Sequence, residues 1–284
     1  MKKLKILITG VNGYIGRHVA DFLLKEGHEV LGADIRFEGL NPQIKQMNYP
    51  IFDGAEDIYD KMGQPDVCIH LAWRDGFIHN SDAHIIDLPK HYLFIKNMLK
   101  GGLKRIAVMG SMHEIGYWEG EIDENTPTNP KSSYGIAKDA LRNITKQLCE
   151  ENDAVFLWLR GYYILGDDSR NHSIFSKIVQ WEAEGKQTFP FTSGKNKFDF
   201  IQVDELARYI AISATQAEVT GIIECATGKP VSLADEVNEF LRLHNFKIRP
   251  EYGAFPDRAY DSPETWGSVK KISAILQNYD KQKG

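Results

Sequence analysis

The chain has 284 residues, of which 42% are hydrophobic and 26% charged, and its formal net charge is −5 at pH 7. This balance, without basic runs, argues against a nucleic-acid or membrane-surface partner, and no apolar stretch approaches the about 20 residues that span a bilayer. The three cysteines, Cys68, Cys149 and Cys225, are far apart and odd in number. We therefore expect reduced, packed thiols in a cytoplasmic protein.

Short apolar segments alternate with helical patterns over the first two-thirds of the chain. The apolar segments are rich in Val, Ile and Leu and lack polar alternation, as strands buried on both faces do. They occupy residues 4–10, 28–35, 66–73, 104–111 and 154–161, and the helical patterns occupy about 14–26, 83–100 and 132–151. This alternation predicts an α/β fold with a Rossmann-like, doubly wound parallel sheet.

The pattern loosens after about residue 166. It predicts a helix within 166–186, a strand running into a helix over 197–214, a short strand over 221–228 and a helix over 232–245. We expect a dinucleotide-binding domain over residues 1–165, with a segment of about 196–217 packed back on it. Residues 166–284 are expected to form a smaller C-terminal α/β lobe that binds the substrate.

Three glycines follow the first apolar segment and precede the first helical pattern. Gly10, Gly13 and Gly16 let the backbone turn sharply and approach a pyrophosphate, which the amides at a helix N-terminus bind favourably. Asp34 closes the second apolar segment, where a carboxylate accepts both ribose hydroxyls and repels a 2′-phosphate. The pattern predicts NAD as the cofactor, although Arg36, two residues later, leaves NADP open.

A tyrosine and a lysine stand four residues apart at the start of the third helical pattern. Tyr134 and Lys138 would share one helix face. A phenol has an ordinary pKa near ~10, and a nearby ammonium lowers that pKa towards the range of a general base. Alone, the pair is more typical of an ordinary helix start with a solvated lysine. The proton-transfer interpretation depends on the glycine loop and on Ser111 upstream.

The G-x-x-G-x-x-G spacing, and the Y-x-x-x-K pair with its upstream serine, resemble the extended short-chain dehydrogenase/reductases that act as NAD-dependent nucleotide-sugar epimerases and dehydratases. The similarity covers roughly residues 4–230. It implies that Tyr134 is the catalytic acid/base, that Lys138 holds the nicotinamide ribose and that Ser111 hydrogen-bonds the reacting oxygen. The cofactor contacts that it implies are Gly10, Gly13, Tyr14, Ile15, Gly16, Asp34, Asp53, Leu71 and Ala72.

Several positions depart from the family pattern around the cofactor and the expected substrate. Trp73 replaces the second alanine of an H-L-A-A segment, Tyr163 stands where many members have asparagine, and Phe198 replaces an arginine. Lys197, next to Phe198, also fits an ordinary solvated surface charge. The candidate substrate contacts are Met112, Tyr163, Lys197 and Arg258, and no metal ligands are expected.

The two positions after Ser111 bear on the reaction. Sugar dehydratases of this family carry an acidic pair there, whereas this chain has Met112 and His113, so dehydration is not expected. His113 is a candidate for proton transfer or substrate contact, or an ordinary loop histidine. We expect NAD-dependent redox chemistry on a nucleotide-activated sugar, with epimerisation through a 4-keto intermediate ahead of an NAD(P)H-dependent 4-keto-6-deoxy-sugar reductase. A dinucleotide sensor without turnover is a remote alternative.

A homodimer is a further expectation that the resemblance implies, through the helices over 83–100 and 132–151. The second helix has apolar residues at spacings that would equally pack on its own sheet. The sequence leaves the two explanations open.

Overall fold

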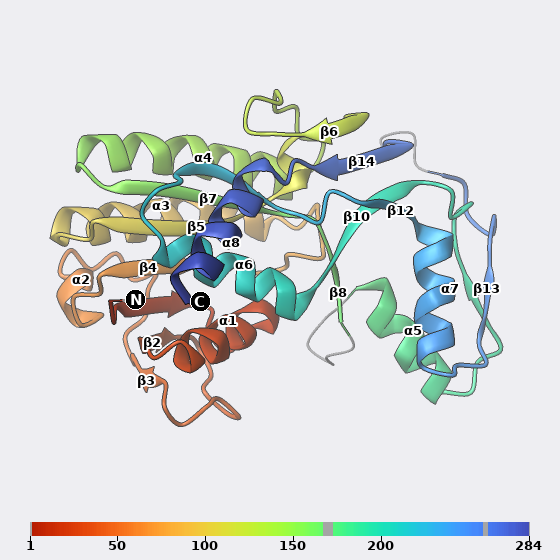
Figure 1. Cartoon of the computed structure of the whole chain (residues 1–284), viewed down its shortest axis with the longest axis horizontal. Helices are drawn as coiled ribbons and strands as arrows, with labels where there is room; N and C mark the ends of the chain where they lie inside the picture. Colours follow the sequence, from red (N-terminus) through yellow and green to blue (C-terminus); the bar gives the residue numbers. More distant parts are fainter. Residues whose placement is uncertain (1, 167–172, 258–260, 284) are drawn as a thin grey trace.

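A computed structural model describes residues 2–166, 173–257 and 261–283. A parallel sheet of seven strands forms its centre (Figure 1). Most of the sheet's residues are buried, because helices cover both faces. In spatial order the strands are β11 (Gly221–Cys225), β7 (Val155–Gly161), β5 (Arg105–Ser111), β4 (Val67–His70), β1 (Lys5–Thr9), β2 (Glu29–Ala33) and β3 (Lys45–Gln46). This arrangement confirms the predicted Rossmann-like α/β fold class.

Two groups of helices cover the two faces of the large sheet (Figure 1). One group packs around a core that includes Val19, Ile210 and Ile272, and the other around a core that includes Phe94 and Leu141. The first group is α1 (Tyr14–Lys25), α6 (Val203–Thr215) and α8 (Lys270–Lys283), and the second is α2 (Ile58–Lys61), α3 (Ala83–Gly101) and α4 (Ser133–Glu151).

A second sheet and a third core lie beside the large sheet. Helices α5 (Ile174–Ala183) and α7 (Leu233–Leu243) pack on a phenylalanine-rich core that includes Phe175, Phe200 and Phe240. The second sheet has the order β12 (Pro230–Ser232), β10 (Lys197–Gln202), β14 (Glu264–Gly267) and β6 (Gly120–Ile122), with β8 (Tyr163–Leu165) also paired to β10. Strands β9 (Thr188–Pro190) and β13 (Arg249–Glu251) form a separate pair.

The chain crosses between the two sheets more often than a single boundary at residue 165 allows. Strand β11 and helix α8, both beyond that residue, belong to the large sheet and its helical cover. The predicted strand-to-helix segment is divided, because β10 joins the second sheet while α6 packs on the first. The buried Asp199 carboxylate on β10 fixes this junction by accepting hydrogen bonds from the backbone N atoms of Thr227 and Gly228, both at 2.8 Å.

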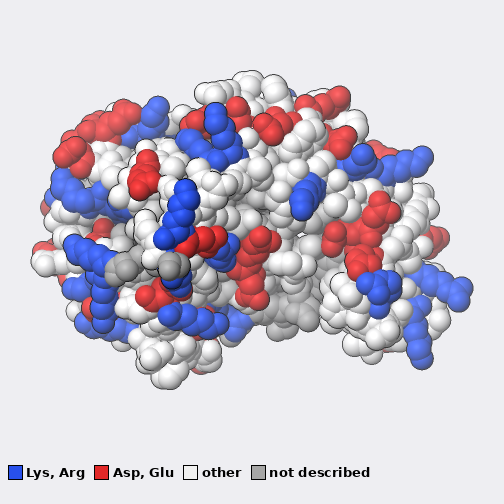
Figure 2. Space-filling model, in the orientation of Figure 1, with Lys and Arg blue, Asp and Glu red and all other residues white. Residues whose placement is uncertain are grey.

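The surface and the helices have properties that bear on partners. Lys/Arg and Asp/Glu side chains are interspersed over the face shown in Figure 2. Within the part of the chain that the structure describes, no helix is both long enough and apolar enough to cross a membrane. The three cysteines are buried free thiols.

Candidate active site

The loop between β1 and α1 is packed so closely that glycine is required at two of its positions. Gly10 has a φ of +70°, and a Cβ there would lie 2.8 Å from the backbone N of Ala72. A Cβ on Gly16 would lie 2.1 Å from the carbonyl O of Gly10. Helix α1 begins directly after Gly13. The positive end of its dipole therefore faces the loop. This cradle fits the pyrophosphate of a dinucleotide.

The Asp34 carboxylate lies against the same loop, just after β2. Its Oδ2 accepts a hydrogen bond from the backbone N of Asn12 at 2.8 Å, and its Oδ1 accepts one from Ile35 at 2.7 Å. These two bonds fix the carboxylate beside the cradle, at a partly exposed position. The structure therefore joins Asp34 to the glycine loop as the sequence pattern requires for a ribose-binding carboxylate.

Of the remaining predicted cofactor residues, Tyr14, Leu71 and Ala72 lie beside this cradle. The Tyr14 hydroxyl donates to the carbonyl O of Leu165 at 3.2 Å, and the backbone N atoms of Leu71 and Ala72 donate to O and Oγ1 of Thr9 at 3.1 and 3.3 Å. Ile15 packs against the core below α1. Asp53 is exposed and accepts a hydrogen bond from the backbone N of Ala55 at 3.0 Å.

Ser111, Tyr134 and Lys138 come together from two elements. Ser111 ends β5 and lies close enough to Tyr134, in the first turn of α4, to lower the pKa of its phenol. The Lys138 Nζ lies 5.8 Å from the centroid of the Tyr134 ring and donates to the carbonyl O of Met109 at 2.7 Å. The Ser132 hydroxyl starts α4 by accepting a hydrogen bond from the backbone N of Gly135. The three predicted catalytic residues thus form one cluster.

Burial sets the charge state of this cluster. Burial lowers the pKa of Lys138 to about 7, while the Glu114 carboxylate acts in the opposite direction. Burial raises the pKa of Tyr134 to about 12, although its hydrogen bond with Ser111 lowers it. Tyr134 is therefore a proton donor at rest, and it needs added positive charge nearby to act as a base.

Two histidines lie beside the phenol of Tyr134. The His113 ring centroid is 5.9 Å from that of Tyr134 and 4.2 Å from that of His79. Tyr163 on β8 approaches from the other side, with its ring centroid 6.5 Å from that of His113. His113 and Tyr163 are thus brought to the cluster, together with His79, which the sequence analysis did not single out.

The other predicted substrate contacts behave differently. Met112 is buried in a small apolar cluster with Ile122 and Tyr162. Lys197 is not brought to the cluster. Phe198, the next residue on β10, contacts Tyr163 with ring centroids 4.3 Å apart, so Lys197 projects from the opposite face of the strand and pairs with Glu264 at 3.4 Å. Arg258 lies outside the described residues.

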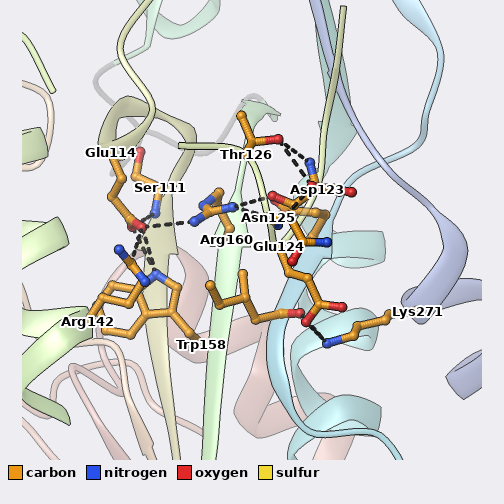
Figure 3. Close-up of polar contacts among 12 residues, drawn as sticks. Ser111, Glu114, Asp123, Glu124, Asn125, Thr126, Arg142, Trp158, Arg160 and Lys271 are labelled. Atoms are coloured by element: carbon orange, nitrogen blue, oxygen red, sulfur yellow. Dashed lines mark hydrogen bonds and ion pairs between the residues drawn. The ribbon is translucent and has the colours of Figure 1, made fainter. Parts of the chain in front are cut away.

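A buried network of charged side chains holds the backbone of Ser111 in place (Figure 3). Glu114, fully buried, accepts hydrogen bonds from the backbone N of Ser111 at 2.7 Å and from Trp158 Nε1 at 3.0 Å. Arg160, 1% exposed, lies between Glu114 and Glu224, at 3.4 and 2.6 Å. The sequence analysis missed these residues, although the S-x-x-E spacing from Ser111 to Glu114 is a capping-box signal, which the structure realises. Among the described residues, no group of His, Cys, Asp and Glu side chains is arranged to hold a metal ion.

A comparison with protein families decides the family of this chain. The model of the NAD dependent epimerase/dehydratase family matches residues 6–226. The chain belongs to the NAD-dependent epimerase/dehydratase family. Membership confirms the predicted resemblance and the expectation of an NAD-dependent enzyme of the extended short-chain dehydrogenase/reductase type.

Known relatives in this epimerase/dehydratase family differ in their similarity to the chain. The dTDP-6-deoxy-L-talose 4-dehydrogenase (NAD(+)) of Aggregatibacter actinomycetemcomitans is 42% identical over 272 residues, covering 93% of this chain and 100% of the relative. The UDP-glucuronate 4-epimerase of Thermodesulfobacterium geofontis is 26% identical, with 95% and 89% covered.

Solved structures of this family share the fold. The UDP-glucose 4-epimerase of Thermotoga maritima with UDP-glucose superposes with a TM-score of 0.80 at 19% identity, covering 99% of this chain and 100% of that one. The UDP-N-acetylglucosamine 4-epimerase of Methanobrevibacter ruminantium has a TM-score of 0.84 at 18% identity, with 97% and 92% covered. These likenesses extend over both sheets of the chain.

Proposed function

We propose that this chain oxidises C4 of a nucleotide-activated sugar with NAD, and that it epimerises the sugar through a 4-keto intermediate. The observation that carries the proposal is the cluster in which Ser111 lies beside Tyr134 and the Nζ of Lys138 lies 5.8 Å from the centroid of the same phenol ring. The 4-epimerases among the relatives and structural neighbours support the same reaction class.

The glycine loop and Asp34 would hold the cofactor. The cradle at Gly10 and Gly16 leaves no room for a Cβ, and the N-terminus of α1 favours an anionic group there. The Asp34 carboxylate would accept the ribose hydroxyls and disfavour a 2′-phosphate, which selects NAD over NADP. When bound, NAD supplies an acceptor for the hydride that leaves C4.

The side chains of the cluster would handle the proton. Tyr134 would take the proton of the C4 hydroxyl, and Ser111 would orient that oxygen by a hydrogen bond. The charged form of Lys138 would favour the phenolate, because a nearby positive charge lowers the pKa of a phenol. His113 and Tyr163 would contact the sugar, because the His113 ring lies beside Tyr134 and the Tyr163 ring lies beside His113.

A second candidate is net dehydrogenation at C4 with release of the ketone. The relative that is 42% identical over its whole length carries the name of an NAD(+)-dependent 4-dehydrogenase, whereas the epimerase relatives reach 22–26%. Both candidates share the first half-reaction. They differ in whether the ketone is reduced again on its other face before it leaves.

One experiment separates the two candidates. The purified protein is analysed by native mass spectrometry for retained NAD⁺ and then incubated with dTDP-6-deoxy-L-talose, both without and with added NAD⁺. Retained NAD⁺ and formation of the 4-epimer without accumulating NADH support epimerisation. Stoichiometric NADH supports dehydrogenation. No change in the sugar, tested also with UDP-glucose and UDP-glucuronate, would remove both.

We also propose that the two parts of the chain bind different ligands. The large sheet with α1, α6 and α8 would bind the cofactor, and the phenylalanine-rich lobe with the second sheet would bind the nucleotide sugar.

Ile86 and Leu93 on α3 and Ile136 on α4 are 61%, 39% and 49% exposed, which supports a homodimer through these helices. Sedimentation of the wild type and of an Ile86→Glu variant tests the dimer. The free thiols suit a cytoplasmic location.

A further inference from the structure

The buried ammonium of Lys138 rests on the face of an indole. Its Nζ lies 3.8 Å from the centroid of the Trp73 ring, and Lys138 itself is 3% exposed. A buried ammonium needs compensating partners. Among the described residues those that the Nζ contacts are the carbonyl O of Met109 and the rings of Trp73 and Tyr134. The indole face is therefore a large part of what surrounds this charge.

The Trp73 ring is held in place by two histidines. Its Nε1 donates a hydrogen bond to the Nδ1 of His84 at 3.1 Å, and its ring is stacked on His91 with centroids 4.5 Å apart and 21° between the planes. Since an indole N–H only donates, the His84 Nδ1 must be the acceptor. The Nε2 of His84 then carries the proton and donates to the carbonyl O of Ile78 at 2.9 Å.

The support continues to the end of β1. His91 Nδ1 is hydrogen-bonded to His70 Nε2 at 2.8 Å, and His70 Nδ1 to Thr9 Oγ1 at 2.8 Å. Thr9 directly precedes Gly10 of the cofactor cradle. An unbroken series of contacts therefore runs from the start of the glycine loop to the ring under Lys138.

The histidine rings beside Trp73 are uncharged near neutral pH, so they do not repel the Lys138 ammonium. The titratable groups that face the Lys138 ammonium are Tyr134 on α4, Glu114 on the turn after β5, His70 on β4 and His91 on α3. Burial lowers the pKa of His91 to about 3 and that of His70 well below its ordinary value. Neither histidine competes with Lys138 for positive charge near neutral pH.

We propose that Trp73 is a positioning residue, whose ring face holds the Lys138 ammonium beside Tyr134 and stabilises its charge. The H-L-A-A segment that residues 70–73 resemble has an alanine at this position. A protein with that segment would have only a methyl group where this chain has the Trp73 ring. Trp73 also lies edge-on to Tyr134, with centroids 6.0 Å apart and 79° between the planes. It thus borders both members of the proposed proton-transfer pair. This inference rests on the proposed role of Lys138 in holding the ribose and lowering the pKa of Tyr134.

The test compares Trp73→Leu, which fills space without a ring, with Trp73→Phe, which keeps a ring face. A matched control is Trp181→Leu, because Lys186 Nζ also lies 3.8 Å from the Trp181 ring, but on the surface of the other lobe. For each variant, NAD⁺ affinity is measured from mildly acidic to alkaline pH, and kcat with dTDP-6-deoxy-L-talose over the same range. Thermal unfolding establishes that each variant is folded.

NAD⁺ affinity and kcat should fall as Lys138 loses its proton, and in Trp73→Leu we expect this fall to move to lower pH by about one pH unit. Trp73→Phe should show a smaller shift, and Trp181→Leu none. A folded Trp73→Leu with the wild-type profiles would overturn the proposal, as would an equal shift in Trp181→Leu. If the wild type does not turn over the sugar, the proposed substrate is wrong, and the NAD⁺ profile still decides the role of Trp73.

Discussion

His79 and Tyr134 are held face to face. Their ring centroids are 5.5 Å apart with 12° between the planes, and the backbone N of Tyr134 donates to the carbonyl O of His79 at 2.9 Å. The contact ties the segment after β4 to the first turn of α4. One face of the phenol is thereby covered, and Ser111 lies close enough to its hydroxyl to lower the pKa of Tyr134.

Replacing Tyr134 by Phe should lower turnover of the nucleotide sugar by roughly 10²- to 10⁴-fold, because the proton acceptor of the reacting hydroxyl is lost. NAD⁺ affinity and the unfolding midpoint should stay near those of the wild type, since the ring is retained. Initial rates of NADH or epimer formation measure the effect.

Tyr92→Phe is the matched control for that variant. Tyr92 and Lys96 on α3 have the same four-residue spacing, and Lys96 Nζ lies 5.5 Å from the Tyr92 ring. Tyr92→Phe should retain the wild-type rate. Equal rates in the two variants would mean that Tyr134 is not the acid/base.

Alanine at Gly16 should abolish detectable NAD⁺ binding, because the new Cβ would meet the carbonyl O of Gly10 at 2.1 Å. The loop must shift, and the overpacking should cost about 1–3 kcal/mol of the free energy of unfolding. Gly27→Ala is the control: its φ is +82° with no atom within 4 Å, so it carries backbone strain alone. Isothermal titration with NAD⁺ should show wild-type affinity for Gly27→Ala, and strong binding by Gly16→Ala would refute the cradle.

Asp34→Ala should erase a preference for NADH over NADPH that we expect to be at least about tenfold in the wild type, since placing like charges together is costly. The loss should come mostly from tighter NADPH binding and partly from weaker NADH binding. Nucleotide fluorescence measures both dissociation constants. An Arg36→Ala variant should change them in the opposite sense, and a wild type that binds both nucleotides equally would contradict the role of Asp34.

Glu224 should make stability fall as the pH rises through the weakly acidic range. Burial raises the pKa of Glu224 from 4.5 to about 7, although the Arg160 charge opposes this. Because the folded chain keeps a proton that the unfolded chain releases, this contribution is complete below pH 4.5 and is lost by about pH 7. At 1.36 kcal/mol per pH unit, the loss is about 3 kcal/mol.

Denaturant unfolding of the wild type and of Glu224→Gln, at several pH values across this range, measures that loss. The difference in the free energy of unfolding should move in favour of the variant as the pH rises. The exposed Glu56 serves as the control, because Glu56→Gln makes the same substitution outside the protein interior. A constant difference for Glu224→Gln would contradict its raised pKa.

The spacing of Tyr134 and Lys138 was informative only in combination with other motifs. Tyr92 and Lys96, and also Tyr279 and Lys283, have the same spacing. What separates the pairs is burial: Lys138 is 3% exposed, whereas the side chain of Lys283 is 47% exposed. Burial depends on the strands that flank a helix, and helix spacing does not report it. The glycine loop and Ser111 supplied the missing information.

The strands of the large sheet other than β3 were predictable because each is an apolar run. Strand β3 was not, since its two residues are polar and exposed. The partner of β11 was not, since its pairing with β7 joins segments more than 60 residues apart. Helix α8 was missed because Ile272 and Ile275 are the buried residues of an otherwise polar segment. The link between Arg160 and Glu224 spans 64 residues, a distance over which local sequence carries no signal.

The position of β11 at the edge of the large sheet has a consequence while the chain is being synthesised. Strand β7 is complete at residue 161, but its outer neighbour β11 is synthesised only after the phenylalanine-rich lobe has begun, at residues 221–225. Until then β7 presents an open, apolar edge, which invites pairing with other chains. The growing chain therefore passes through an interval in which it is most prone to aggregation. That interval closes when Gly221–Cys225 docks beside β7.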